Sequence, residues 1–177
     1  MTKLTLVAIA ALLALAGCGA APDYAAEHKA ATDAFLAAWN SGAVDGLDAV
    51  TSKDIKRRSP GGLDTDGLGA YKKIVLGMRT SYPDLKLVVD DGHYMKDVAY
   101  FQWTFIGTNS GPGGMPPTGK SVKLMGVTRV KYQDDKVVDE RVFFDTLDWN
   151  QQLGFTLTPP ASAQPAAAAA APAAKKK

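Results

Sequence analysis

Val98-Ala-Tyr-Phe-Gln-Trp-Thr-Phe-Ile-Gly-Thr108 is the stretch that decides the fold. It is rich in aromatic and β-branched residues and has a period of two, which predicts a β-strand. Successive side chains of a strand point to opposite faces of the sheet. One face of this strand therefore carries Ala99, Phe101, Trp103 and Phe105, and the other carries Tyr100, Gln102 and Thr104.

Three further segments carry the same strand pattern: residues 85–94, 121–133 and 136–147. Asp134-Asp135 predicts a tight hairpin between the last two strands. The Gly- and Pro-rich residues 110–119 predict a longer loop. These segments together indicate a run of antiparallel strands.

Helical spacing dominates the chain before Pro83. Residues 22–40 place apolar side chains at steps of three and four, and Ser41-Gly42 ends that helix. A short helix follows at 44–51 and a longer one at 66–81, which Pro83 stops. Helices followed by strands predict an α+β domain, with helices on one face of a curved sheet and an apolar pocket between the layers.

Composition is that of one ordinary globular domain: 177 residues, 46% hydrophobic and 21% charged. Four of the 20 basic residues, Lys3 and Lys175–Lys177, lie in the end segments, so the rest of the chain is slightly acidic despite a net charge of +2. This excludes a nucleic-acid binder of the basic-patch kind. The only cysteine is Cys18, and the two histidines have no ligand spacing, so no metal site is expected.

The N-terminus has the features of an export signal. Lys3 precedes a thirteen-residue apolar run, 4–16, which is shorter than the roughly 20 residues of a spanning helix. Leu15-Ala16-Gly17-Cys18 resembles a bacterial lipobox, which implies a signal peptide at 1–17 and an acylated Cys18 that anchors the protein to a membrane of the cell envelope. Gly19 after the cysteine favours the outer membrane. The alternative is an ordinary secretory signal with an incidental cysteine.

The predicted cleavage before Cys18 divides the rest of the chain into three segments. A short linker at 18–21 leads to one domain at 22–158. The Ala- and Pro-rich residues 159–177, which end in three lysines, have no apolar periodicity and predict a flexible extension.

One carboxylate has an unusual sequence setting. Asp145 follows Val142-Phe143-Phe144 near the end of an apolar strand, where an ionised carboxylate is costly unless it is paired. A raised pKa there would suit a general acid or base. The alternatives are a hydrogen bond to backbone at the strand end or an ion pair with Arg129 or Arg141. Asp148 is expected to cap the following helix.

Two residues of the aromatic strand are further candidates. Gln102 is an amide among aromatic side chains and needs a hydrogen-bond partner. Trp103 is either core or part of a cavity wall.

Several short motifs resemble the SnoaL-like polyketide cyclases, in the expected order over residues 25–154. The motifs are Trp39-Asn40-Ser41-Gly42, Tyr82-Pro83-Asp84-Leu85, Trp103-Thr104-Phe105-Ile106-Gly107-Thr108, Pro117-Thr118-Gly119-Lys120, Phe144-Asp145 and Gln152-Leu153-Gly154. The resemblance implies the nuclear transport factor two-like fold, a conical α+β barrel around an apolar cavity. It also implies intramolecular aldol chemistry without metal or cofactor.

The resemblance assigns roles to individual positions. Asp145 takes the place of the catalytic aspartate, and Asn40 matches an asparagine that lines the cavity. Arg58 stands where many relatives have histidine, and Arg129 or Lys131 occupies the neighbourhood of a second cavity histidine.

Two functions follow from these observations. The first is a membrane-anchored, cofactor-free ester cyclase or isomerase, in which Asp145 moves a proton on a small apolar carbonyl or ester compound. Asn40, Arg58, Gln102, Trp103 and Arg129 would then bind the substrate. The alternative is a non-catalytic envelope lipoprotein that holds a small molecule in the same cavity. The sequence leaves a homodimer open.

Overall fold

The computed structural model describes residues 22–158. The predicted signal peptide at 1–17, the acylation of Cys18, the linker and the extension at 159–177 lie outside the described residues and stay predictions. Within residues 22–158, no helix is both long and apolar enough to cross a membrane.

The helices before Pro83 form close to where the sequence predicts them. The first predicted helix is two helices, α1 (Tyr24–Glu27) and α2 (Lys29–Ser41), joined at His28. Gly42 ends α2 in the left-handed conformation, with φ of 80°. The short second segment is a 3-10 turn, η1 (Val44–Gly46), followed by α3 (Leu47–Val50). The long helix α4 (Leu68–Ser81) ends two residues before Pro83.

Four strands match the predicted strand segments within a few residues. They are β3 (Lys86–Tyr94), β4 (Val98–Thr108), β5 (Ser121–Gln133) and β6 (Lys136–Phe144). Neighbours pair antiparallel, and Asp134 and Asp135 take positive φ values in the hairpin between β5 and β6.

Two further strands are not predicted by the sequence pattern: β1 (Thr51–Arg58) and β2 (Thr65–Asp66). They complete a six-stranded sheet in the order β2-β1-β6-β5-β4-β3, in which β1 runs parallel to β6. The strand β1 contains a single aliphatic residue, Ile55, among charged neighbours. The inward face of β1 therefore gives no apolar alternation to detect, because Arg57 takes the next buried position on it.

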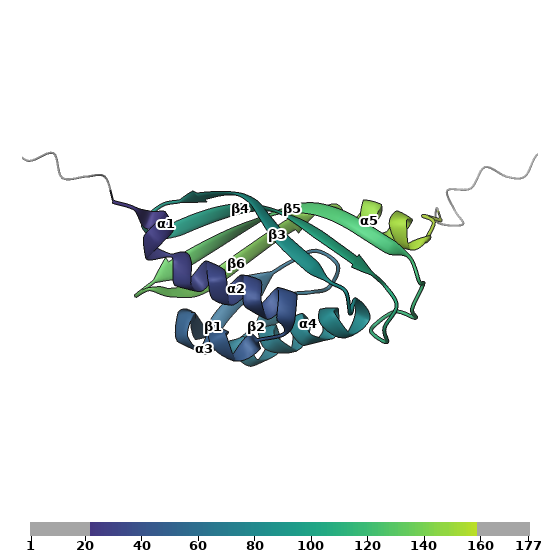
Figure 1. The fold of residues 1–177 in the computed structure, drawn as a ribbon, viewed down its shortest axis with the longest axis horizontal. Coiled ribbons are helices and arrows are strands. Elements are labelled where there is room, and N and C mark those ends of the chain that lie inside the picture. The colour runs from purple at the N-terminus through teal and green to yellow at the C-terminus, as the bar shows by residue number, and fades with distance from the viewer. Residues whose placement is uncertain (1–21, 159–177) are drawn as a thin grey trace, which may run out of the picture.

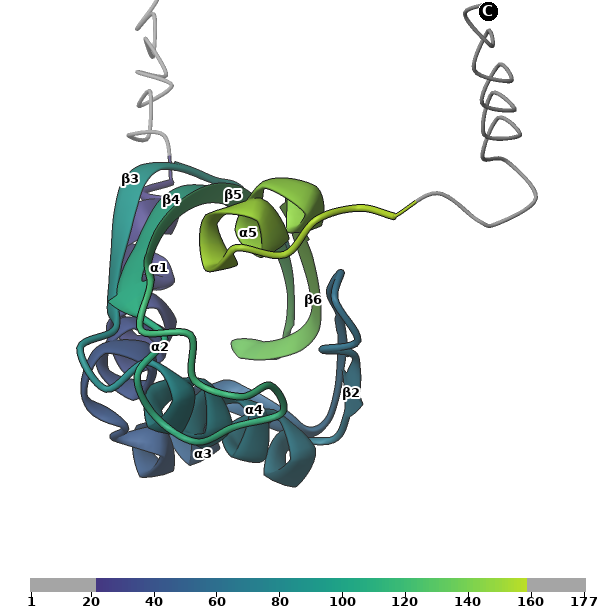
Figure 2. The ribbon, with the colours of Figure 1, turned by 90° about the vertical axis from the view of Figure 1, so that its right-hand side faces the viewer.

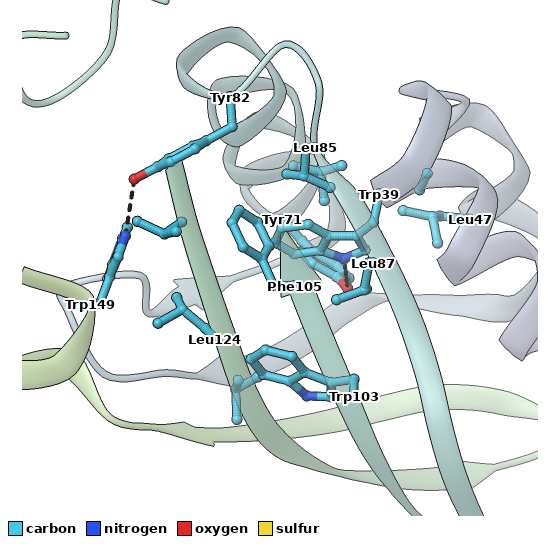
Figure 3. Packing of buried hydrophobic residues seen from close by; sticks show 14 of the residues in the cluster. Trp39, Leu47, Tyr71, Tyr82, Leu85, Leu87, Trp103, Phe105, Leu124 and Trp149 are labelled. Carbon is cyan, nitrogen blue, oxygen red and sulfur yellow. Dashed lines mark hydrogen bonds between the residues drawn. The ribbon is translucent and has the colours of Figure 1, made fainter. Parts of the chain in front are cut away.

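The sheet curves over the helices, so the fold is the predicted α+β arrangement. Strands β3 to β6 form the curved layer, and α2, α3 and α4 lie against its concave side (Figures 1 and 2). The last helix, α5 (Thr146–Leu153), follows β6, and the β4–β5 loop passes across the same end of the layered structure (Figure 2). The main core lies between the layers and includes Trp39, Tyr71, Trp103 and Phe105 (Figure 3).

Candidate active site

Three hollow spaces follow one another through the interior. The vestibule, of about 300 Å³, lies where the β1–β2 loop, α4, the β4–β5 loop and α5 meet. It shares Leu63, Met78 and Trp149 with the inner chamber, which has about 50 Å³ of space. The inner chamber in turn shares Phe35, Thr128 and Glu140 with the end chamber, of about 30 Å³.

The inner chamber is mostly apolar. Its aromatic and aliphatic walls come from α2, the ends of α4 and α5, and the concave face of the sheet (Figure 3). The residues that line it are Phe35, Trp39, Arg57, Leu63, Met78, Leu87, Trp103, Phe105, Leu124, Thr128, Glu140, Val142, Phe144 and Trp149.

A buried pair of opposite charges interrupts this apolar wall. Arg57 on β1 and Glu140 on β6 are partners in the parallel ladder, and each side chain is 3% exposed. Arg57 Nε lies 3.3 Å from Glu140 Oε2, close enough for an ion pair. The two atoms are not oriented as a hydrogen bond, and within residues 22–158 neither has another hydrogen-bond partner. This pair is therefore held mainly by charge, with the Tyr71 hydroxyl close to the carboxylate, and it keeps hydrogen-bonding capacity for a ligand.

Arg57 is held in place by its other contacts. Its Nη1 donates to the carbonyl oxygen of Leu63 at 2.6 Å. The guanidinium lies 6.0 Å from the ring centre of Trp39 and 5.7 Å from that of Tyr71, within cation–π range. Trp39 Nε1 donates to the Tyr71 hydroxyl at 3.3 Å (Figure 3). These contacts fix the cation beside the carboxyl group.

Glu140 has the two properties expected of a carboxyl group that acts as a general acid or base, burial and a raised pKa. Burial raises the pKa of Glu140, and the charge of Arg57 opposes that rise only in part. Within the described part of the chain, Oε1 also has no hydrogen-bond partner. Burial likewise raises the pKa of Tyr71 well above its ordinary value, with the Glu140 charge as the next cause, so Tyr71 stays a neutral phenol. A carboxyl with a raised pKa in a cavity is suited to proton transfer.

Trp103 is the one predicted substrate-binding residue that lines the inner chamber. It is buried, and its Nε1 donates to Thr128 Oγ1 at 2.9 Å, on the neighbouring strand β5. Trp103 therefore closes part of the wall and orients the hydroxyl of Thr128, a residue that lines both chambers.

Asn40 links a helix to a strand. Its Nδ2 donates to the carbonyl oxygen of Leu87 at 2.9 Å, and its Oδ1 accepts from the Leu87 N–H at 2.7 Å. Both ends of the amide are thus used to join α2 to β3, and Asn40 is not among the residues that line the three spaces.

Three other predicted residues lie away from the chambers. Gln102 is exposed on the convex face of β4. Arg129 forms an ion pair with Asp139 on the convex face, next to Arg141 on β6. Arg58 makes an ion pair with Asp66 at 2.9 Å, and the Asp66 hydrogen bond raises the pKa of Arg58.

Asp145 is exposed and caps α5. Its Oδ1 accepts from the backbone N–H groups of Leu147 at 2.8 Å and Asp148 at 3.0 Å. The expectation that Asp148 would cap this helix is wrong, because the chain already leaves the sheet at Asp145. Of the alternatives named for Asp145 in the sequence analysis, the structure shows the hydrogen bond to backbone at the end of the strand. It lines none of the three spaces, and its catalytic role stays a prediction.

The sequence pattern does not reveal the Arg57–Glu140 pair, and the reason is register. Strand alternation puts Asp139, Arg141 and Phe143 on one face of β6, and that face is the convex one. Glu140, Val142 and Phe144 face inward. Arg58, the arginine predicted for this part of the chain, is likewise one residue away from Arg57, which lines the inner chamber. A usable signal was Glu140 itself, one of only two glutamates in the chain, placed before Val142 and Phe144 at strand spacing.

Within residues 22–158, no group of three or more His, Cys, Asp or Glu side chains is arranged to hold a metal ion. The polar groups of the two chambers that could meet a small molecule include those of Arg57, Glu140, Tyr71 and Thr128.

Comparison with known proteins shows where this architecture recurs. AclR from Streptomyces galilaeus is 27% identical with a TM-score of 0.63, over 77% of this chain and 87% of that one. A SnoaL-like protein from Jannaschia sp. CCS1 is 21% identical with a TM-score of 0.68, over 81% of this chain and 100% of that one. TerC, crystallised with polyporic acid, is 16% identical with a TM-score of 0.59, over 72% of this chain and 98% of that one.

No curated protein matches the sequence. The family model described as SnoaL-like polyketide cyclase matches residues 29–153, which contain α2 to α5, the whole sheet and the inner chamber. The chain therefore belongs to the SnoaL-like polyketide cyclase family.

Proposed function

We propose that this protein binds a small, mostly apolar carbonyl compound in the inner chamber and that Glu140 moves a proton on it. One observation carries the proposal: Glu140 is a buried carboxyl whose oxygens have no well-aligned hydrogen-bond partner among residues 22–158, set in an apolar wall beside a fixed cation and the Tyr71 phenol. Burial of such a group is unfavourable for folding, so its presence favours a function. The crystallisation of the relative TerC with polyporic acid supports a small organic ligand in this fold.

The proposed chemistry is a cyclase- or isomerase-like proton transfer. Ionised Glu140 takes the proton from the carbon beside the carbonyl group, and the electrons of that C–H bond form an enolate. Arg57 Nε, which has no hydrogen-bond partner among residues 22–158, stabilises the enolate oxygen. In a cyclisation, the enolate carbon bonds to a second carbonyl carbon of the same molecule. The alkoxide formed there takes the proton back from Glu140, so the carboxylate is regenerated.

Anchoring to a membrane of the cell envelope through Cys18 is part of the proposal. It rests on the lipobox-like run that ends at Cys18. An anchor there would hold the domain near apolar compounds that partition into the membrane.

The proton transfer can be tested without knowing the physiological substrate. A purified sample is incubated in D₂O with a dialkyl ketone, and deuterium incorporation beside the carbonyl is followed by NMR. We expect exchange above the rate in protein-free solution, and Glu140→Gln should reduce this protein-dependent exchange at least about a hundredfold. Glu27→Gln makes the same chemical change at an exposed position and should leave exchange unchanged.

Each other outcome has a definite meaning. Exchange that is no faster than in protein-free solution, with the ketone bound, would contradict catalysis and favour the binding lipoprotein. Equal exchange by wild type and Glu140→Gln would remove Glu140 from the mechanism.

A further inference from the structure

The position of Glu140 along the interior bears on the shape of the ligand. Glu140, Phe35 and Thr128 are common to the inner chamber and the end chamber, so they lie at the boundary between the two. The inner chamber adjoins the vestibule at Leu63, Met78 and Trp149, which line both spaces. The end chamber lies on the far side of the boundary. The carboxyl group therefore stands partway along a row of spaces, and not at its closed end.

Both sides of that boundary are apolar. Toward the vestibule, the wall is built by Leu87, Trp103, Phe105, Leu124, Val142 and Phe144. On the far side it is built mainly by Ala31, Leu47, Val89, Phe101, Val130 and Val137. Among the described residues that line either chamber, Arg57 and Glu140 alone are charged.

Five hydroxyl-bearing side chains also line the end chamber, and all of them are neutral: Thr32, Thr51, Tyr71, Thr128 and Tyr132. The Thr32 hydroxyl already donates to the carbonyl oxygen of His28. The Tyr132 ring stacks on His28, with 3.7 Å between ring centres, and burial raises the pKa of Tyr132 so that it stays neutral. The far side therefore offers no charged partner for the end of a ligand.

We infer that the ligand is an elongated neutral molecule whose reactive oxygen is internal, with an apolar segment on each side of it. The inference rests on the proposed function, because it takes Glu140 and Arg57 as the groups that meet the oxygen. A short apolar segment would occupy the end chamber, and a longer one would run through the inner chamber to the vestibule. A ligand with a terminal carboxylate would instead place a second negative charge beside Glu140 and leave one chamber empty.

The size of the end chamber sets the expected preference. About 30 Å³ of space holds roughly two water-sized atoms. Burial of one methylene group is worth roughly a fourfold gain in affinity. Two additional methylenes placed in the end chamber should therefore strengthen binding by roughly tenfold or slightly more.

Isomeric ketones test the inference directly. Methyl heptyl ketone and propyl pentyl ketone have the same formula and differ only in the position of the carbonyl. Their dissociation constants are measured on the purified full chain by displacement of the neutral dye Nile red, with nonane as an apolar reference. We expect propyl pentyl ketone to bind roughly tenfold tighter than methyl heptyl ketone, because its two additional methylenes on the short side fill the end chamber. The two additional methylenes of the heptyl chain reach only the wider, partly polar vestibule and stay hydrated there. Equal binding, or tighter binding of the methyl ketone, would overturn the inference and leave the proposed function standing.

A variant locates the effect in the end chamber. Ala31→Leu on α2 fills that chamber and should weaken the binding of propyl pentyl ketone roughly tenfold, to the affinity of the methyl ketone. The affinity for the methyl ketone itself should change less than about twofold. Ala37→Leu, at an exposed position of the same helix, should change neither affinity. If Ala31→Leu does not fold, the ratio of the two ketones' dissociation constants on the wild-type chain still tests the inference. A failure of every ketone to bind would contradict the proposed function and this inference together.

Discussion

Arg57 and Glu140 lie opposite each other on two parallel strands, and neither has an apolar side chain that pattern analysis could detect. Their pairing is nevertheless the main electrostatic feature of the interior. A buried pair of this kind contributes little to stability, because each charge loses its hydration. The unfavourable free energy of burying the two charges is greater here, since the ion pair lacks a well-aligned hydrogen bond between Nε and the carboxylate.

Glu140 should make folding stability depend on pH. Its pKa in the folded protein lies above the ordinary value of 4.5, so the folded chain holds a proton that the unfolded chain has already released. The free energy of unfolding should therefore fall as the pH rises from about 4.5 through the raised pKa. The slope is at most about 1.4 kcal/mol per pH unit, the value for one proton.

Urea denaturation of wild type and Glu140→Gln at several pH values checks this prediction. The difference between their unfolding free energies should grow with pH over that window, whereas Glu27→Gln should follow wild type throughout. Parallel pH curves for wild type and Glu140→Gln would show that the pKa of Glu140 is not raised.

At the scale of elements, α5 depends on its N-terminal cap. Asp145 accepts hydrogen bonds from two of the first backbone N–H groups of the helix, which otherwise have no partner inside it. Asp145→Ala should cost about 1 kcal/mol, while Asp145→Asn should stay within about 0.5 kcal/mol because asparagine also caps well. Asp148→Ala is the matched control and should have a smaller effect than Asp145→Ala. A larger loss from Asp148→Ala in chemical denaturation would contradict the assignment.

The pairing of β4 with β5 depends on a glycine. Trp103 lies opposite Gly126, and a Cβ at Gly126 would come within 2.2 Å of the Trp103 ring and 2.7 Å of the Phe143 carbonyl oxygen. Gly126→Ala should therefore displace the indole and cost about 1–3 kcal/mol. Gly77→Ala in α4, where a Cβ meets nothing within 4 Å, should instead stabilise the protein by up to about 1 kcal/mol. Thermal unfolding of the two variants gives the comparison, and an unchanged Gly126→Ala would mean that the indole relaxes freely.

At the scale of the whole molecule, the predicted membrane anchor at Cys18 can be tested in cells. Within residues 22–158, no helix is suited to cross a bilayer. We expect wild type to sediment with membranes and Cys18→Ser to appear as soluble protein or uncleaved precursor, because acyl chains supply the membrane affinity. Cell fractionation with intact mass measurement checks this. A mature wild-type chain without added lipid mass would exclude the anchor.

Much of the architecture could be predicted from the sequence, because it depends on local signals. The alternation in β4 and β5, the helical spacing up to Ser81, the stop at Pro83 and the Asp134-Asp135 turn each act over a few residues. Their order predicted the α+β layering, and the short motifs predicted the family.

The position of the candidate site was decided only by the tertiary structure. Alternation shows that the two faces of a strand differ, but on β6 both faces carry charged and aromatic side chains, so the pattern cannot tell which one turns inward. The curvature of the sheet over α2 and α4 places Glu140 inside and leaves Asp139, Arg141 and Phe143 outside. Arg57 joins Glu140 only because β1, far away in the sequence, pairs in parallel with β6. That contact depends on the closure of the whole sheet, which no local pattern of residues contains.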